Sequence, residues 1–248
     1  MRILISNDDG VMAPGICALA EAFRQFGEVF VVAPDGERSA KSHSITVHDP
    51  IRLDSVEMAD GITVWKCSGT PVDCVKLGIE GLAIQPDVVV SGINAGYNLG
   101  TDVLYSGTVG AAAEGYIHDI PAFAFSFEGK RADEMAVIAK EAAAIFARFA
   151  PKAIKEKLFL NVNFPPLREG GYRGIRIAPL GRRDYNNTFI KRQDPTGRTY
   201  YWMGGTPIEE SRDIVTDTTA VRDGYISITP IQIDMTNHTK LVDLTAEA

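Results

Sequence analysis

This chain has few of the residues that build disulfide-stapled domains or zinc centres. Its 248 residues include three cysteines and four histidines, and none of them forms a CxxC, HxH or HExxH pair. An odd number of unpaired cysteines in apolar surroundings is typical of packing residues in a reduced protein. Zinc sites use clustered nitrogen and sulfur ligands. The sequence therefore argues against a disulfide scaffold and against a zinc centre.

An excess of basic residues and a long apolar run are also missing. The formal net charge is −7, whereas sequence-independent binding of nucleic acid needs a basic surface. No segment approaches the roughly 20 apolar residues that span a bilayer, and the first apolar run is too short for a secretory leader. We expect a cytoplasmic protein with neither a nucleic-acid nor a membrane partner.

Three common motifs of nucleotide-binding or hydrolytic proteins are absent. The first strand is not followed by GxGxxG, and the chain contains neither GxxxxGK[ST] nor GxSxG. Ser68-Gly69-Thr70 is the nearest approach to such a loop. Because Pro71 follows it, and proline favours the first turn of a helix, we interpret this segment as structural.

Apolar segments with strand character alternate with amphipathic, helix-like segments over the first two thirds of the chain. We expect strands at about 2–6, 28–33, 62–67, 87–91, 121–126 and 158–163, and helices at about 15–26, 72–82, 107–118 and 133–149. This alternation predicts an α/β fold with a doubly wound, mainly parallel sheet.

The pattern changes beyond about Pro165. Residues 182–205 are polar and aromatic with little helical periodicity, which favours a projecting β-hairpin. One further strand is expected at 225–229, and the tail beyond it is weakly patterned. Without repeats or a low-complexity linker, we expect one domain over 1–248. Its core would span about 1–165, and a hairpin and C-terminal oligomerisation arm would span about 166–248.

Two adjacent acidic residues, Asp8 and Asp9, follow directly after the first apolar strand in Asn7-Asp8-Asp9-Gly10. Open parallel sheets bind ligands beyond the carboxyl ends of their strands. Adjacent carboxylates repel each other unless a cation lies between them. The same four residues are also good turn formers, so a simple polar turn is the alternative for this motif taken alone.

Two more polar loops follow predicted strands and should reach the same sheet edge. Residues 34–42 include the hydroxyl of Ser39, and residues 91–98 include the amides of Asn94 and Asn98. Carboxylate, hydroxyl and amide oxygens are hard ligands that suit Mg²⁺ or Mn²⁺. Together with the two acids, these loops predict a magnesium or manganese site.

A fourth loop, Tyr105-Ser106-Gly107-Thr108, opens an alanine-rich helix. The first N–H groups of a helix lack intrahelical partners and lie at its positive end, which makes this position a phosphate cradle. An ordinary serine cap is the alternative.

Seven segments, in this order, resemble the SurE family, the stationary-phase survival proteins that act as metal-dependent 5'-nucleotidases. They are RILISNDDG at 2–10, APDGERS at 33–39, GTPVDCVKL at 69–77, SGINAGYN at 91–98, YSGTV at 105–109, LNVNFP at 160–165 and GYISITP at 224–230. The resemblance implies a Rossmann-like core with an extended hairpin. It also implies a C-terminal arm exchanged between subunits of a homodimer or homotetramer.

The resemblance also assigns roles to individual residues. The implied ligands of one divalent cation per subunit, Mg²⁺ or Mn²⁺, are Asp8, Asp9, Ser39 and Asn94. The implied phosphate contacts are Asn98, Ser106, Gly107 and Thr108. Asp8, Asp9 and Asn98 are the residues expected to be catalytic. In the loop after the second strand, Lys41 and His43 depart from the smaller residues expected there.

The implied activity is hydrolysis of nucleoside 5'-monophosphates, extending to 3'-monophosphates and short polyphosphate. Whether Asp8 or Asp9 is only a metal ligand or also a nucleophile stays open. A second open question is His238, which either donates a proton to the leaving alcohol from an exchanged arm or is an ordinary surface residue. Two other functions remain as alternatives: a nucleotide- or phosphate-sensing protein and a metal-dependent hydrolase of amides or glycosides.

Overall fold

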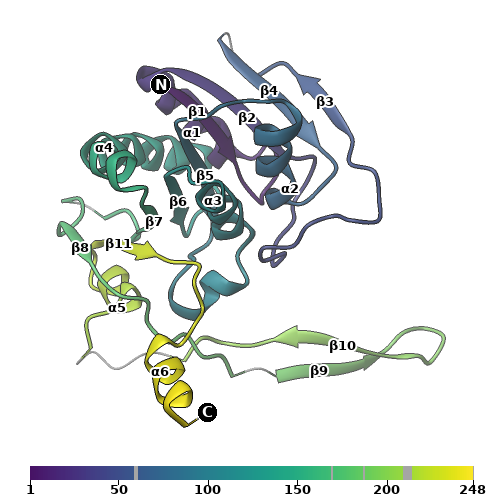
Figure 1. Cartoon of the computed structure of the whole chain (residues 1–248). Coiled ribbons are helices and arrows are strands. Elements are labelled where there is room, and N and C mark those ends of the chain that lie inside the picture. Colours follow the sequence, from purple (N-terminus) through teal and green to yellow (C-terminus); the bar gives the residue numbers. More distant parts are fainter. Residues whose placement is uncertain (59–60, 169, 187, 209–213, 248) are drawn as a thin grey trace.

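The protein is described by a computed structural model that covers residues 1–58, 61–168, 170–186, 188–208 and 214–247. A nine-stranded sheet runs through it in the order β3-β4-β2-β1-β5-β6-β7-β11-β8 (Figure 1). The strands are β1 (Arg2–Ser6), β2 (Glu28–Pro34), β3 (Leu53–Val56), β4 (Ile62–Cys67), β5 (Val88–Ala95), β6 (Ala122–Phe127), β7 (Phe159–Phe164), β8 (Ile175–Ile177) and β11 (Ile226–Ile231). The six strands from β4 to β7 are parallel, and β3 and β11 run antiparallel to their neighbours β4 and β7.

Helices cover both faces of the sheet. On one face α1 (Pro14–Phe23) packs against α4 (Ala132–Glu156), and on the other α2 (Pro71–Lys76) packs against α3 (Gly107–Ile117). Successive strand residues point to opposite faces, so Ile3 and Ile5 join the core under α1 and α4 while Leu4 joins the core under α2 and α3. The doubly wound α/β fold predicted from the sequence is confirmed.

Several elements differ from their predicted extents. The predicted helix at 72–82 is divided into α2 and the π-helical turn η2 (Leu77–Gly81). Helix α4 continues through Pro151 to Glu156, since its buried stripe reaches Ala153. The predicted helix at 15–26 is divided into α1 and the 3₁₀ turn η1 (Arg24–Phe26). Short elements without a readable period were not predicted: β3, the 3₁₀ turn η3 (Gly100–Leu104), β8 and α5 (Asp217–Arg222).

The predicted hairpin is present as a separate two-stranded antiparallel sheet, β9 (Thr188–Gln193) and β10 (Thr199–Gly204), which projects from the body (Figure 1). Near its base the hairpin exposes apolar side chains, including Trp202 (62% exposed) and Met203 (73% exposed). The weakly patterned tail forms the exposed helix α6 (His238–Glu247). In the described part of the chain, no helix is both long and apolar enough to cross a membrane.

Candidate metal and phosphate site

A pocket of about 1180 Å³ lies at the carboxyl edge of the parallel strands. Six of the predicted site residues line it: Asp8, Asp9, Ser39, Asn94, Asn98 and Ser106. The other two, Gly107 and Thr108, follow directly in the first turn of α3. The four loops singled out in the sequence therefore meet at one place, because each follows a strand of the same sheet or precedes α3.

The loop that carries the two acids is closed by Asn7. The Asn7 amide nitrogen donates to the Gly10 carbonyl (2.9 Å), and the Gly10 N–H donates to the Asn7 side-chain oxygen (3.2 Å). Gly10 has φ +104, and a Cβ there would lie 3.1 Å from the Gly36 Cα. Glycine is thus required at this position. The polar turn considered as an alternative exists, and it holds the two acids at the pocket.

Asp8 is buried against the start of α3. Its carboxylate accepts a hydrogen bond from the Thr108 hydroxyl, and a Cβ at Gly107 would lie 2.9 Å from the Asp8 Cβ. Burial raises the pKa of Asp8 to about 6, and the negative charge of Asp9 adds to the rise while the Thr108 hydrogen bond opposes it. Among the described residues, no basic side chain forms an ion pair with Asp8 or Asp9. A bound cation would favour the charged form of this carboxyl group.

The remaining predicted ligands are each oriented by one hydrogen bond. Asp9 Oδ2 accepts from the Ala95 N–H (2.9 Å), which ties the β1 loop to the end of β5. The Asn94 amide nitrogen donates to the Gly96 carbonyl (2.9 Å), so its oxygen is left to accept or to ligate. Ser39 donates its proton to Glu37 (2.6 Å), which leaves the hydroxyl lone pairs free.

This donor set fits a hard divalent cation. Two carboxylates, a hydroxyl and an amide oxygen are the ligand types of Mg²⁺ and Mn²⁺. The described part of the chain contains no cluster of three or more His, Cys, Asp or Glu side chains arranged to hold a metal ion. Such a site therefore depends on the neutral oxygens of Ser39 and Asn94 in addition to the two acids.

The start of α3 has both features considered for it in the sequence, a serine cap and a helix terminus that can bind phosphate. Ser106 caps the helix, since its hydroxyl oxygen accepts from the Val109 N–H (3.0 Å). Thr108 is 0% exposed and its hydroxyl is used on Asp8. Any contact of Gly107 or Thr108 with phosphate is therefore expected to come from their backbone N–H groups, at the positive end of the helix.

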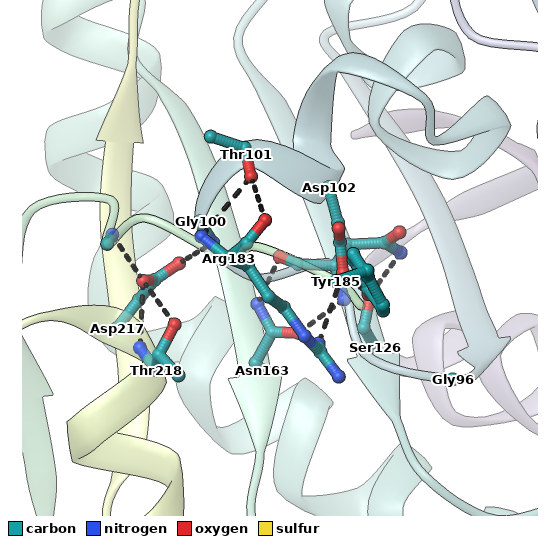
Figure 2. Close-up of polar contacts among 12 residues, drawn as sticks. Gly96, Gly100, Thr101, Asp102, Ser126, Asn163, Arg183, Tyr185, Asp217 and Thr218 are labelled. Carbon is teal, nitrogen blue, oxygen red and sulfur yellow. Dashed lines mark hydrogen bonds and ion pairs between the residues drawn. The ribbon is translucent and has the colours of Figure 1, made fainter. Parts of the chain in front are cut away.

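A second group of polar residues also lines the pocket. Tyr185 donates its hydroxyl proton to Asp102 (2.6 Å), and the Arg183 guanidinium lies 3.2 Å from the same carboxylate oxygen. The Thr101 hydroxyl donates to the Arg183 carbonyl (2.7 Å). Figure 2 shows these contacts between the 3₁₀ turn η3 and the segment that leads into the hairpin.

Asp217, at the start of α5, joins these two segments (Figure 2). It is 0% exposed, and its two carboxylate oxygens accept from the N–H groups of Gly100 and Gly181, both at 2.8 Å. Burial raises the pKa of Asp217, and the N–H groups that it accepts oppose the rise. A residue from the C-terminal third thus fixes the loop that carries the pocket-lining residues Asn98 and Asp102.

Several pocket residues were not found from the sequence. They are Glu37, Asp102, Lys130, Arg183 and Tyr185. Lys130 follows β6 and had the same signal as the predicted loops, namely a polar residue after a parallel strand. Burial raises the pKa of Asp9, and the positive charge of Lys130 acts in the opposite direction. Arg183 and Tyr185 precede an exposed hairpin, where no strand or helix period marked them.

Three further residues considered in the sequence lie elsewhere. His238 is on the exposed arm, with its Nε2 atom 2.7 Å from Asp234, and it is not among the described residues that line this chain's own pocket. His43 lies 3.1 Å from the buried Glu114 carboxylate, and neither His43 nor Lys41 is part of the described pocket lining. The catalytic role of His238 in a neighbouring subunit stays a prediction.

Comparisons with known proteins agree on one family. A family model described as Survival protein SurE matches residues 3–187. The 5'-nucleotidase SurE of Heliobacterium modesticaldum is 46% identical over 246 residues, covering 98% of this chain and 90% of that protein. The 5'-nucleotidase SurE of Pelotomaculum thermopropionicum is 49% identical, covering 96% and 92%. The crystal structure of the SurE protein from Aquifex aeolicus has a TM-score of 0.83 and 38% identity, with 99% of each chain covered.

Proposed function

This chain belongs to the SurE family, and on that premise we propose that it is a 5'-nucleotidase that hydrolyses nucleoside 5'-monophosphates to nucleoside and phosphate. The observation that carries this function is the contact between Asp8 and the first turn of α3. A carboxylate that can hold a cation lies directly beside a helix start that can hold phosphate. Nucleoside 3'-monophosphates and short polyphosphate are proposed as further substrates.

We propose that Asp8, Asp9, Ser39 and Asn94 hold one divalent cation, Mg²⁺ or Mn²⁺. The support is the oxygen chemistry of these four side chains and the burial of Asp8 without a protein cation beside it. A bound divalent cation polarises a phosphoryl oxygen and lowers the pKa of a bound water.

The chain's own residues would position the phosphoryl group and the water. The N–H groups at the start of α3, together with Ser106 and Asn98, would bind the other phosphoryl oxygens. Phosphoryl transfer depends mainly on positioning and charge stabilisation, so few covalent participants are needed. We prefer Asp8 and Asp9 as ligands, with one of the pair orienting or deprotonating the attacking water. The Lys130 ammonium group, which lines the same pocket, adds a positive charge for the phosphate.

We also propose that the chain forms a homodimer or homotetramer through its hairpin and C-terminal arm. The exposed apolar side chains of Phe189, Tyr201, Trp202 and Met203 on β9 and β10 support an interface there. Sedimentation of the wild type and of Trp202→Lys tests this proposal, and the variant is expected to have a lower mass than the wild type. A wild type that sediments as a monomer, with the same mass as the variant, would contradict it.

The activity is tested by phosphate release from a panel of 5'- and 3'-nucleoside monophosphates with Mg²⁺, Mn²⁺ or EDTA. Release that needs the metal and is lost on chelation is expected. Binding of AMP with metal but without turnover over hours would favour a sensing protein instead. Turnover of amides or glycosides without turnover of p-nitrophenyl phosphate would favour a metal-dependent hydrolase of amides or glycosides.

A further inference from the structure

We propose that Ser126, Asn161 and Asn163 form a buried clamp that positions Asn98 for catalysis. None of the three belongs to the described lining of the pocket, whereas Asn98 lines it. The clamp gives a catalytic purpose to the segment 160–165, which the sequence comparison singled out but to which no role was assigned. This inference rests on the proposed function, because it assumes that Asn98 contacts the phosphate.

Two side chains from β7 form the hydrogen bonds that hold the backbone of Asn98 in the described part of the chain. Its N–H donates to the Asn163 side-chain oxygen (2.9 Å), and its carbonyl accepts from the amide nitrogens of Asn161 (2.8 Å) and Asn163 (3.0 Å). Asn161 and Asn163 are 0% exposed. Being two residues apart on a strand, they face the same side of the sheet and can bind one peptide group from two directions.

The side chain of Asn98 is held by the neighbouring strand β6. Its amide nitrogen donates to the Ser126 hydroxyl (2.8 Å), and Ser126 pairs in register with Asn163. Figure 2 shows Ser126 and Asn163 beside the loop that carries Asn98. Because one amide hydrogen is donated to Ser126, this bond restricts the rotation of the Asn98 amide group, and with it the directions of the second hydrogen and the oxygen.

These residues are unusual in their setting. Burying polar groups between apolar strands costs free energy unless they are hydrogen-bonded. Within the same buried row, Ser227 on β11 pairs in register with Asn163, yet its hydroxyl has no hydrogen-bond partner among the described residues. The row therefore contains two serines that can be compared. The Ser126 hydroxyl accepts a hydrogen bond from Asn98, whereas the Ser227 hydroxyl has no hydrogen-bond partner among the described residues.

The experiment compares Ser126→Ala with Ser227→Ala. Steady-state phosphate release from 5'-AMP is measured at saturating Mn²⁺, and folding is followed by circular dichroism. Because a small misplacement of a group that positions the substrate can lower the rate by up to about 100-fold, Ser126→Ala is expected to lower kcat about tenfold. Ser126 is the in-register β6 neighbour of the proposed ligand Asn94, but its hydroxyl bonds to Asn98. Because the substitution removes this hydroxyl and leaves the backbone pairing in place, the Mn²⁺ concentration for half-maximal activity should stay unchanged. Ser227→Ala should retain wild-type kcat.

A double-mutant cycle separates positioning from general loosening of the fold. In an Asn98→Ala background, Ser126→Ala should have no further effect, because the group it orients is gone. Asn163→Asp keeps the acceptor for the Asn98 N–H but, when ionised, loses the donor to the Asn98 carbonyl. Its activity relative to wild type should recover at low pH, where the neutral carboxyl group donates again.

The outcomes are distinguishable. A wild type with no metal-dependent phosphate release overturns the proposed function and this inference with it. An active wild type in which Ser126→Ala and Asn163→Asp both match Ser227→Ala overturns the clamp alone. If Ser126→Ala lowers kcat by the same factor in the wild type and in the Asn98→Ala background, Ser126 acts through the stability of the fold, and this outcome also overturns the clamp.

Discussion

The pocket has two walls of different origin. The inner wall, comprising Asp8, Asp9, Asn94, Asn98 and Ser106, comes from loops at the ends of the parallel strands. The outer wall, comprising residues 182–185, 203–205 and 208, comes from the C-terminal third around the base of the hairpin. The inner wall is largely buried and fixed by hydrogen bonds to backbone, whereas the outer wall reaches residues as exposed as Met203. If the proposed function holds, the groups that would bind the cation and the phosphate lie on the more buried side, and the more exposed side is left for the nucleoside.

The largest effect is expected from the inner wall. Asp8→Asn removes the carboxylate that joins the proposed cation ligands to the start of α3, and should lower metal-dependent kcat by about 10³-fold or more. Phosphate release from 5'-AMP with Mn²⁺ measures it. Asp54→Asn, which changes an exposed acid on β3, is the control and should be silent. Near-normal activity of Asp8→Asn would refute the site assignment.

The same carboxyl group should make the metal-free protein sensitive to pH. Its folded pKa of about 6 exceeds the usual 3.8, so folding favours the neutral form. The stability that this provides is complete below pH 4 and is lost as pH rises through about 6. The cost of keeping Asp8 ionised is about 3 kcal/mol at pH 8.

Urea unfolding in EDTA tests this prediction. Asp8→Asn should raise the free energy of unfolding of the metal-free protein at pH 8, and should raise it much less at pH 4.5. An equal difference at the two pH values would contradict the raised pKa. Added Mn²⁺ should reverse the order at pH 8, because the wild type alone keeps the full ligand set.

The junction between the walls should give a smaller effect. Asp217→Asn replaces one accepting oxygen with an amide nitrogen, so that a donor faces the N–H of Gly100 or Gly181. One unsatisfied buried donor should lower the free energy of unfolding by about 1–3 kcal/mol. Urea titration measures it, and activity should fall because both walls shift. Asp223→Asn, at the other end of α5, is the matched control. Equal stability of the two variants would show that Asp217 does not join the walls.

The smallest effect is expected on the outer wall. Tyr185→Phe removes the 2.6 Å hydrogen bond to Asp102 and leaves the ring in place. The loss should be about 0.5–1.5 kcal/mol, seen as a few-fold rise in KM for 5'-AMP with kcat little changed. Tyr200→Phe on the exposed hairpin should be silent. If Tyr185→Phe lowered kcat as much as an inner-wall variant does, the proposed functional difference between the two walls would be wrong.

Sequence reasoning reached the inner wall because strand ends are readable. The end of an apolar run such as Ile3–Ile5 indicates where a strand ends, and in a parallel sheet the carboxyl ends of the strands lie on one edge. Asp8, Asn94 and Asn98 could therefore be placed together before any coordinates were known. Lys130 obeys the same rule and was overlooked. Arg183 and Tyr185 had no comparable signal, since their segment has neither a helical nor a strand period.

The sequence by itself determined the alternation of strands and helices, the doubly wound sheet and the edge on which its polar loops gather. Those features follow from local hydrophobic period and from the chirality of parallel connections. Only the tertiary structure decided that Asn161 and Asn163 grip the backbone of Asn98, and that Asp217 joins Gly100 to Gly181. Such contacts join residues more than 30 positions apart through single hydrogen bonds. No local pattern encodes which distant backbone group a buried polar side chain will meet.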